Sequence, residues 1–212
     1  MAPNHEYAIL GGFNRAKVGH LIGAVAATAS SALVAIVFVL AGLSERIGLS
    51  GRISPVVLVW ISAGSIYAVL YWIFDEHLWR WRRVAKALRV PDLSGDWLCT
   101  GQTINPDKTV GHQWSGRLTI VQSWDRLCVR LKTAQSESKS ITASLLKDDS
   151  SGFRLMYSYR NDPGIEQADL ASHLGHSEIL FSNDLHSGAG EYFNGHGRYT
   201  FGTLSLVRKV AA

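Results

Sequence analysis

The side chains best suited to hold a ligand gather in two short segments of the second half of the chain. These segments are Tyr157–Asn161 and Tyr192–Arg198, in which tyrosines stand close to arginine, asparagine and histidine. Tyrosine rings can stack on flat ring systems, and arginine and amide groups can donate hydrogen bonds to phosphate. For the tyrosines, packing within a strand is the competing interpretation. Arg198 and Asn161 are the stronger candidates, because they lie in turn-rich segments, where functional residues tend to collect.

Patterns typical of enzymes are missing from the sequence. It contains no Gly-x-Ser-x-Gly, no glycine-rich phosphate loop and no helical zinc-hydrolase motif. Of the eight histidines, His173 and His176 are three residues apart, which on a strand places them on opposite faces. We therefore expect no catalytic residue and no metal site, with a metal site formed by His176, Glu178 and later histidines as the alternative.

The elements that carry the candidate residues are predicted to be strands. After Pro91, apolar and polar residues alternate, and residues common in turns separate the alternating runs. This pattern is typical of an antiparallel sheet. Eight runs with short connections favour a small up-and-down eight-stranded β-barrel, with a β-sandwich as the alternative. The runs are 93–100, 114–121, 126–132, 140–146, 153–160, 173–181, 190–194 and 198–208.

One local pattern favours the barrel over the sandwich. Gly95-Asp-Trp97 opens the first predicted strand, and Arg208 ends the last one. This arrangement is similar to small ligand-binding barrels such as lipocalins, in which a tryptophan of the first strand packs under an arginine of the last. We therefore predict that Trp97 and Arg208 plug the closed end of the barrel and serve a structural role.

A membrane region is predicted ahead of this all-β domain. Residues 18–43 and 53–74 lack Asp, Glu, Lys and Arg, and each stretch is as long as the about 20 residues that a helix needs to cross a bilayer. Buried core helices seldom stay uncharged for so long, and a signal peptide has a shorter apolar region. We therefore predict two transmembrane α-helices and a basic juxtamembrane helix within residues 1–90, followed by the barrel in residues 91–212.

The charge distribution predicts an orientation and excludes one class of partner. Lys and Arg flank the two spans on the side of the termini, so both termini should be cytoplasmic. Residues 1–90 carry 9 Lys and Arg against 4 Asp and Glu, and residues 91–212 carry 12 against 13. A domain without a basic excess is a poor candidate for binding DNA or RNA. In the cytoplasm, Cys99 and Cys128 should remain free thiols.

Small residues form a stripe along the first span. Gly23, Ala27 and Ser31 recur every four residues, a spacing that lets two helix backbones approach closely. The stripe predicts either packing within the helical hairpin or self-association in the membrane, and the two are compatible. Neither span contains a charged residue, which argues against an ion pathway or a selective transporter.

Several short motifs, in this domain order, resemble a known bacterial family over the whole chain. They are Leu93-Ser-Gly-Asp-Trp97, Tyr157-x-Tyr159-Arg-Asn161-x-Pro163, His173-x-Gly175, Gly190-Glu-Tyr192-Phe-Asn-Gly-His-Gly-Arg198 and Gly202-Thr-Leu-Ser-Leu-Val-Arg208. The chain resembles the two-transmembrane, β-strand-rich effectors of CBASS, the cyclic-oligonucleotide antiphage signalling systems.

The resemblance implies an effector that has no catalytic activity and no cofactor. A cognate nucleotidyltransferase, triggered by infection, would supply a cyclic dinucleotide, and the cytoplasmic barrel would bind it as the activating ligand. Binding would drive the protein to form homo-oligomers. The helices would then disrupt the lipid bilayer of the bacterial inner membrane, so that the infected cell dies before the phage matures.

The resemblance also implies where the ligand binds. Two flat bases and two phosphates need aromatic faces and a few donors, without a strongly basic surface. One departure from the family pattern lies at Asn194-Gly195-His196, where a basic side chain is expected, so Arg198 would supply the charge of that loop. A membrane-tethered barrel for a lipid or another apolar molecule is the alternative. The predicted ligand contacts are Tyr159, Arg160, Asn161, His173, Tyr192, Asn194 and Arg198.

Overall fold

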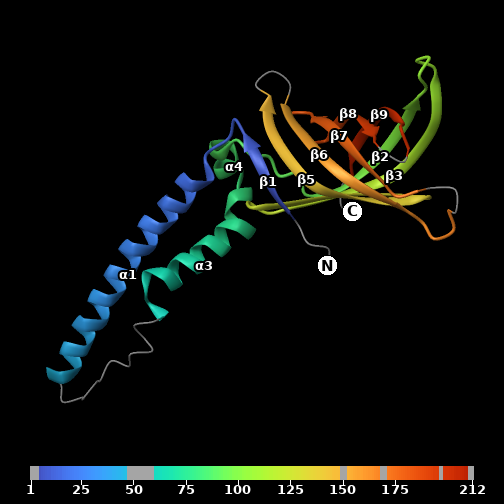
Figure 1. The fold of residues 1–212 in the computed structure, drawn as a ribbon. Coiled ribbons are helices and arrows are strands. Elements are labelled where there is room, and N and C mark those ends of the chain that lie inside the picture. Colours follow the sequence, from blue (N-terminus) through green and yellow to red (C-terminus); the bar gives the residue numbers. More distant parts are fainter. Residues whose placement is uncertain (1–4, 47–59, 149–151, 168–170, 196–197, 210–212) are drawn as a thin grey trace. The chain divides into compact units, whose positions relative to one another are not determined.

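The computed structural model describes residues 5–46, 60–148, 152–167, 171–195 and 198–209. The chain forms two compact units (Figure 1). One unit is helical and consists of Phe13–Trp79, and the other joins Met1–Gly12 to Arg80–Ala212. The second unit contains all the strands of the protein that lie in the described residues.

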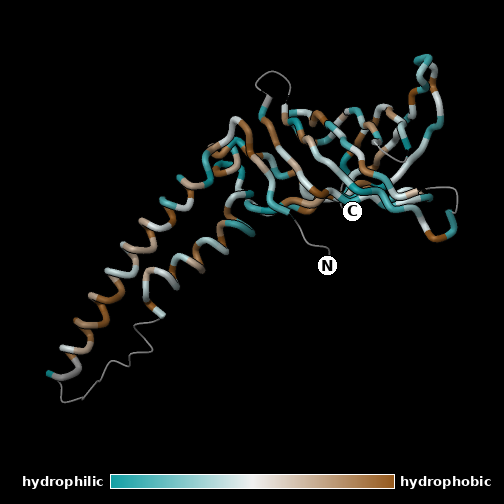
Figure 2. Tube along the Cα trace, viewed as in Figure 1, coloured by the Kyte–Doolittle hydropathy of each residue, from teal (hydrophilic) through white to brown (hydrophobic). Residues whose placement is uncertain are grey.

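The helical unit is a pair of packed helices, α1 (Arg15–Arg46) and α3 (Ala63–Glu76). Gly19 of α1 faces the ring of Tyr67, whose hydroxyl oxygen would lie 3.6 Å from a Cβ atom at that glycine. Many large apolar side chains of α1 are exposed. Figure 2 shows that hydrophobic residues recur along this helix. Such a surface is stable where lipid replaces water around the helix.

The first predicted span is confirmed as a helix long enough to cross a bilayer. With 32 residues, α1 is about 48 Å long, and a stretch of 18 residues within Arg15–Leu43 has a mean hydropathy of 2.3. It is the one such helix among the described residues. The second predicted span is described in part, because its residues 53–59 lie outside the described ranges. Its remainder belongs to α3, which has 14 residues and is about 21 Å long.

Short helical turns connect α3 to the sheet. They are the 3₁₀ turn η1 (Leu78–Arg80) and the seven-residue helix α4 (Arg82–Leu88). Arg89 adopts a left-handed conformation with φ of 57° at the end of α4, and Pro91 follows two residues later. Because proline disfavours helix before it, the chain leaves α4 in extended form and enters the sheet.

The strands close into a ring in the order β1-β4-β3-β2-β9-β8-β7-β6-β5, so the β-sandwich alternative is wrong. Strands β2 to β9 follow one another as antiparallel neighbours, and β2 pairs with β9 to bring the two ends of the meander together. Their bounds are β2 Gly95–Ile104, β3 Val110–Gln122, β4 Arg126–Thr133, β5 Ser136–Asp148, β6 Gly152–Pro163, β7 His173–Phe181, β8 Ser187–Asn194 and β9 Phe201–Arg208.

The prediction of eight strands was wrong by one, because the N-terminal residues add a ninth. Strand β1 (His5–Leu10) lies between β4 and β5, pairing antiparallel with β4 and parallel with β5. Little in the sequence indicates this strand, since it has six residues and its partners lie more than a hundred residues further along the chain. All eight runs predicted as strands do form strands.

One end of the barrel is filled by Trp97 and its neighbours. The Trp97 side chain is fully buried, and the guanidinium carbon of Arg208 lies 5.0 Å from the centre of its ring. Phe181 packs edge-on against the same ring at 4.9 Å, and the indole N–H donates to the Leu93 carbonyl over 3.1 Å. Cation–π and edge-to-face contacts of this kind add to the stability gained by burial.

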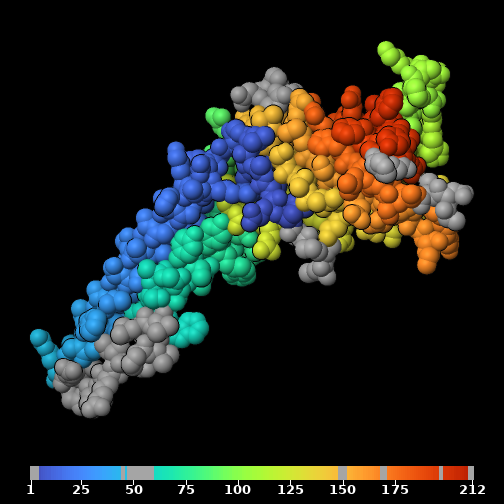
Figure 3. Space-filling view, viewed as in Figure 1, coloured from blue at the N-terminus to red at the C-terminus, as the bar shows by residue number. Residues whose placement is uncertain are grey.

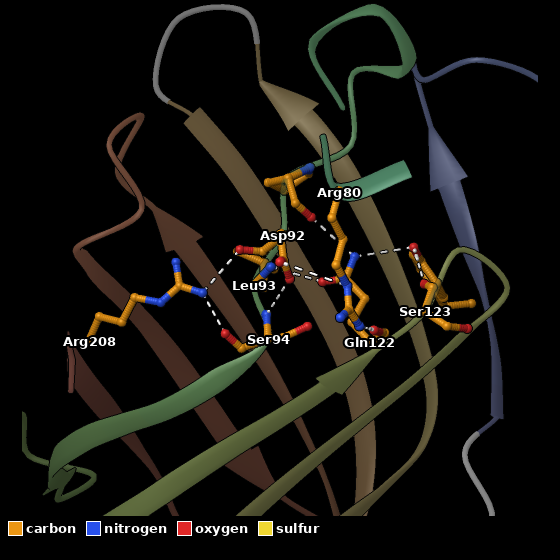
Figure 4. Close-up of polar contacts among 9 residues, drawn as sticks. Arg80, Asp92, Leu93, Ser94, Gln122, Ser123 and Arg208 are labelled. Atoms are coloured by element: carbon orange, nitrogen blue, oxygen red, sulfur yellow. Dashed lines mark hydrogen bonds and ion pairs between the residues drawn. The ribbon is translucent and has the colours of Figure 1, made fainter. Parts of the chain in front are cut away.

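Gln122 joins three chain segments at this closed end (Figure 4). Its side-chain oxygen accepts from Leu93 N–H over 2.9 Å, and its Nε2 donates to the Pro91 carbonyl over 3.1 Å and to the Tyr7 hydroxyl over 3.2 Å. Arg80 donates to the main-chain carbonyl of Gln122 over 2.5 Å. This buried amide therefore ties β1 and the segment that enters β2 to strand β3.

Replacing Gln122 by leucine should lower the free energy of unfolding by about 2–4 kcal/mol. The variant leaves the Leu93 N–H and the Pro91 carbonyl buried without partners, at about 1–3 kcal/mol for each group. Denaturant unfolding of the full chain in detergent, followed by tryptophan fluorescence, measures the change. Gln113→Leu is the matched control, since Gln113 is exposed on the same strand. Equal stabilities of the two variants would contradict the role of Gln122.

Candidate ligand-binding site

A cavity of about 670 Å³ occupies the other end of the barrel. Its walls come from the last residues of β2, β4, β6 and β8 and the first residues of β3, β5, β7 and β9, which meet at one rim. Trp97 and Arg208 lie at the opposite ends of their strands, so the plug and the cavity occupy different ends. A volume within about 300–1,000 Å³ is typical of sites for small organic ligands.

Six of the seven predicted ligand contacts line this cavity. Arg160 is the exception, because it lies between Tyr159 and Asn161 on β6 and points to the exposed outer face. Side chains alternate between the faces of a strand, so neighbours of two inward residues must point outward. Arg160 therefore does not line this cavity, and its contact with a ligand stays a prediction. The six that line the cavity are Tyr159, Asn161, His173, Tyr192, Asn194 and Arg198.

Trp114 also lines the cavity and was missed by the sequence analysis. Its indole N–H donates to the Tyr192 hydroxyl over 3.2 Å, and the two rings meet edge to face at 5.7 Å. The alternating run that begins at Trp114 puts this ring on the same face as the buried Leu118. That alternation was the signal that could have identified it.

Glycines opposite two of the aromatic residues make room for their rings. Gly101 pairs with Trp114, and Gly175 pairs with Tyr159. A Cβ atom at Gly101 would lie 2.1 Å from the Trp114 ring, and one at Gly175 would lie 2.4 Å from the Tyr159 ring. Each ring therefore lies flat over the backbone of its partner strand, as aromatic side chains do over glycine in sheets.

Hydrogen bonds hold the polar ends of these side chains. The Tyr159 hydroxyl donates to Asn194 Oδ1 over 2.9 Å, and Asn194 Nδ2 donates to the Thr200 hydroxyl over 2.7 Å. The hydroxyls of Thr103 and Tyr192 are 3.0 Å apart. With its carbonyl and amide ends both engaged, Asn194 has a fixed orientation, and the rings are presented to the cavity in a defined geometry.

Asn161 lines the cavity and has a buried donor without a partner in the described part of the chain. The residue is 7% exposed, and its Nδ2 atom has no hydrogen-bond partner among the residues that the structure describes. A buried donor without a partner costs about 1–3 kcal/mol, and this cost is removed only when a group that accepts from it comes within reach. His173 lies beside it on β7, with its Nδ1 atom 3.1 Å from the Ala171 carbonyl. Because a carbonyl only accepts, Nδ1 carries the proton and Nε2 is left for other contacts.

The electrostatics of the cavity favour a negatively charged ligand. The lining side chains contain no carboxylate among the described residues, and they include Arg198 and two histidines. Burial raises the pKa of Tyr159 above its usual range, while the Arg198 guanidinium acts in the opposite direction. Burial also raises the pKa of Tyr157. Both phenols therefore stay neutral near pH 7 and act as donors.

Comparison with known proteins places both parts of the chain in one family. A family model described as "Cap15, cyclic dinucleotide receptor domain" matches residues 88–208, and "Cap15, TM helices" matches residues 16–80. The chain belongs to the Cap15 family. It is similar to "CD-NTase-associated protein 15" of Yersinia aleksiciae, with 41% identity over 207 residues that cover 97% of each chain.

Membership of the Cap15 family confirms the resemblance to CBASS effectors. The receptor-domain match contains β2 to β9 and hence the cavity, and the helix match contains α3 and all but the first residue of α1. This Cap15 chain is therefore a membrane protein with transmembrane helices and a receptor domain. Neither family description names a catalytic domain.

Adding a methyl group at Gly175 should distort the cavity. In Gly175→Ala, the new Cβ overlaps the Tyr159 ring, which must move and lose its hydrogen bond to Asn194. We expect a loss of about 1–3 kcal/mol in unfolding free energy and a changed near-ultraviolet circular dichroism spectrum. Gly195→Ala is the control, because its Cβ would meet nothing closer than 3.4 Å. Indistinguishable spectra for the two variants would contradict the packing described here.

Proposed function

We propose that this protein binds a cyclic dinucleotide in the barrel cavity and responds by associating in the inner membrane, which the assembled helices then disrupt. The observation that carries the proposal is a cavity that combines aromatic rings, a buried unpartnered amide donor on Asn161 and the cation of Arg198, with no carboxylate among its described lining residues. Death of the infected cell follows from loss of the membrane barrier.

The lining chemistry matches the parts of such a ligand. Two bases need flat apolar partners, for which Trp114, Tyr157, Tyr159 and Tyr192 are available, and each stacked base contributes about 1–3 kcal/mol. The phosphates carry two negative charges and need donors rather than a basic surface. Arg198, together with neutral hydroxyl and amide groups, supplies them in a partly buried site where charge-assisted hydrogen bonds are strong.

A lipid or another apolar ligand fits the cavity less well. Only three aliphatic side chains, Leu131, Ala134 and Leu204, are among its described lining residues. A fatty acyl chain would leave the hydroxyl and amide groups of the wall without partners. The two ligand classes are separated by thermal unfolding, since the ligand that binds the native state raises the midpoint temperature.

Two of the three small residues in the stripe on α1 are available for association with another copy in the membrane. Gly23 packs toward Tyr67 of the same hairpin, whereas Ala27 and Ser31 are exposed on α1. The proposal therefore assigns the contact between copies to Ala27 and Ser31. Arginines and lysines precede the first helix and follow the second, and this distribution favours cytoplasmic termini. A cytoplasmic C-terminal part would hold the barrel in the compartment where the nucleotide is made.

The direct test is calorimetric titration of the full chain in detergent with a panel of cyclic dinucleotides. The full chain is required because a fragment starting at residue 91 lacks β1 and leaves the ring of strands incomplete. We expect tight binding to at least one member of the panel. Absence of binding to every member, together with stabilisation by a fatty acid, would favour the apolar ligand instead.

Asn161→Asp should weaken nucleotide binding at least tenfold, or by about 1.4 kcal/mol. The substitution keeps the shape of the side chain but replaces the free donor by a carboxylate, which repels phosphate. Arg160→Gln is the matched control, since it changes the charge of the adjacent outward residue and should leave the affinity unchanged. Unaltered affinity in Asn161→Asp would remove this residue from the site.

Ala27→Leu should prevent nucleotide-induced leakage of a dye from vesicles while leaving the affinity for the nucleotide intact. The larger side chain keeps the exposed helix surface apolar but blocks close approach of a second helix. Ala32→Leu makes the same change on another exposed face of α1 and should leave leakage unaffected. Equal leakage from both variants would show that helices do not associate through Ala27.

A further inference from the structure

Strands β4 and β5 follow each other in the sequence, but pairing between them does not close this part of the ring. Strands β4 and β5 pair directly only between Arg130–Lys132 and Glu137–Lys139, and then separate. Their separated edges, Arg126–Val129 of β4 and Ser140–Leu146 of β5, form what we call the seam. Strand β1 fills the seam, and Figures 1 and 3 show it in blue beside the yellow β5.

We propose that the seam accepts β1 from a second copy of this chain, so that copies associate by exchanging their N-terminal strands. This inference deepens the proposed function, because it names a contact through which the receptor domains join. The occupant is defined by the structure itself, since the seam already holds this segment in its own chain. A second copy supplies the same residues and can form the same pairs.

The contacts in the seam are specific to β1. At the point where β4 and β5 separate, the Ser140 hydroxyl accepts from Val129 N–H over 2.9 Å and lies 2.6 Å from His5 Nε2. Tyr7 is 3% exposed and bonds to Gln122. Glu6 stands directly opposite Arg126, which places opposite charges across the seam. Exchange between copies would preserve these contacts, so the interactions that change within each copy are confined to the hinge.

The connection after β1 is suited to act as that hinge. Four residues separate Leu10 at the end of β1 from Arg15 at the start of α1, and two of them are glycines. Gly11 has a φ of +74°, a conformation that other residues rarely adopt. Short hinges at the end of a terminal element are common where elements exchange between copies. On the β4 side, moreover, only two residue pairs hold the strand.

The seam begins next to the ligand cavity. Ser138 lines the cavity, and Ser140 follows two residues later on the same face of β5, where the seam opens. The strand partner of Ser140 on β6 is Tyr159, which also lines the cavity. A nucleotide that shifts Ser138 or Tyr159 therefore acts on the residue that bonds to His5. This proximity links occupancy of the cavity to release of β1.

Exchange would also change which helices are joined. Because β1 continues into α1, a copy whose β1 lies in a neighbour's seam attaches its first membrane helix to the neighbour's barrel. Reciprocal exchange closes a dimer, and one-way exchange builds an open chain of copies. Confinement to a membrane raises the effective concentration of the seams and favours both.

The test uses disulfide trapping of the full chain in vesicles. Two populations with different tags, Glu6→Cys and Arg126→Cys, are reconstituted together and oxidised with and without each of cyclic di-AMP, cyclic di-GMP and cyclic GMP-AMP. Directly opposed residues of antiparallel strands lie within disulfide reach. Lys132→Cys replaces Arg126→Cys in the control mixture, because it is also exposed on β4 but about 20 Å further along the strand. The native Cys99 and Cys128 are buried and do not interfere.

If strands exchange, a nucleotide that binds should produce disulfide-linked heterodimer in the mixture of Glu6→Cys and Arg126→Cys. We expect the yield to be at least ten times that of the control mixture. An amine-reactive cross-linker and calorimetry report association and binding in parallel. Association without the heterodimer overturns strand exchange and leaves the proposed function intact. Binding without any association overturns exchange together with the association step of the proposed function, and absence of binding overturns the proposed ligand.

A second variant tests the inference from the opposite side. Glu6→Cys and Arg126→Cys in the same chain, oxidised before the nucleotide is added, lock β1 in its own seam. We expect this protein to bind nucleotide normally and to lose most of its association, with recovery after reduction. Full association of the locked protein would overturn the inference.

Discussion

Closure of the strand ring is the constraint on which the rest of this structure depends. Eight consecutive antiparallel strands carry the meander from β2 round to β9, but β4 and β5 diverge after three residue pairs. A barrel with such a gap would expose unpaired main-chain groups on both edges, an arrangement that invites aggregation. Strand β1 removes the gap, and its Tyr7 hydroxyl is also bonded by Gln122 at the closed end. The segment that precedes the membrane helix is thus an integral part of the receptor.

The two ends of the barrel have opposite physical properties because different residues fill them. At the closed end, Trp97, Phe181 and Arg208 exclude water, and Gln122 satisfies buried main-chain groups. At the other end, Gly101 and Gly175 let two aromatic rings lie flat against the wall, which leaves space inside. The closed end is therefore tightly packed, and the other end keeps a cavity of a size that suits small organic ligands. The membership of the Cap15 family fits this division of tasks.

Much of this architecture was predictable from the sequence, and the exceptions have physical explanations. Period-two alternation revealed all eight strands after Pro91, since each has one buried and one exposed face. The same alternation in Tyr159-Arg160-Asn161 places Arg160 on the outer face of the barrel. The ligand contacts were predicted from residue types within short motifs, and residue type does not indicate on which face of a strand a side chain lies. Strand β1 was not predictable, because six residues without a nearby partner carry no pairing information. The tight fit of Trp114 over Gly101 also depends on register, which only the folded sheet reveals.

The position of β1 ahead of the membrane helices has a consequence for synthesis. His5 is synthesised long before its partner Ser140, which lies 135 residues further along. Both membrane helices are made in between, so they are available for insertion before the last strands exist. Pairing over such a distance carries a large loop-closure cost and is slow to form. The ring of strands can therefore close only after the helices and the strands up to β9 have been made, so the helices are available to the bilayer before the receptor domain has folded.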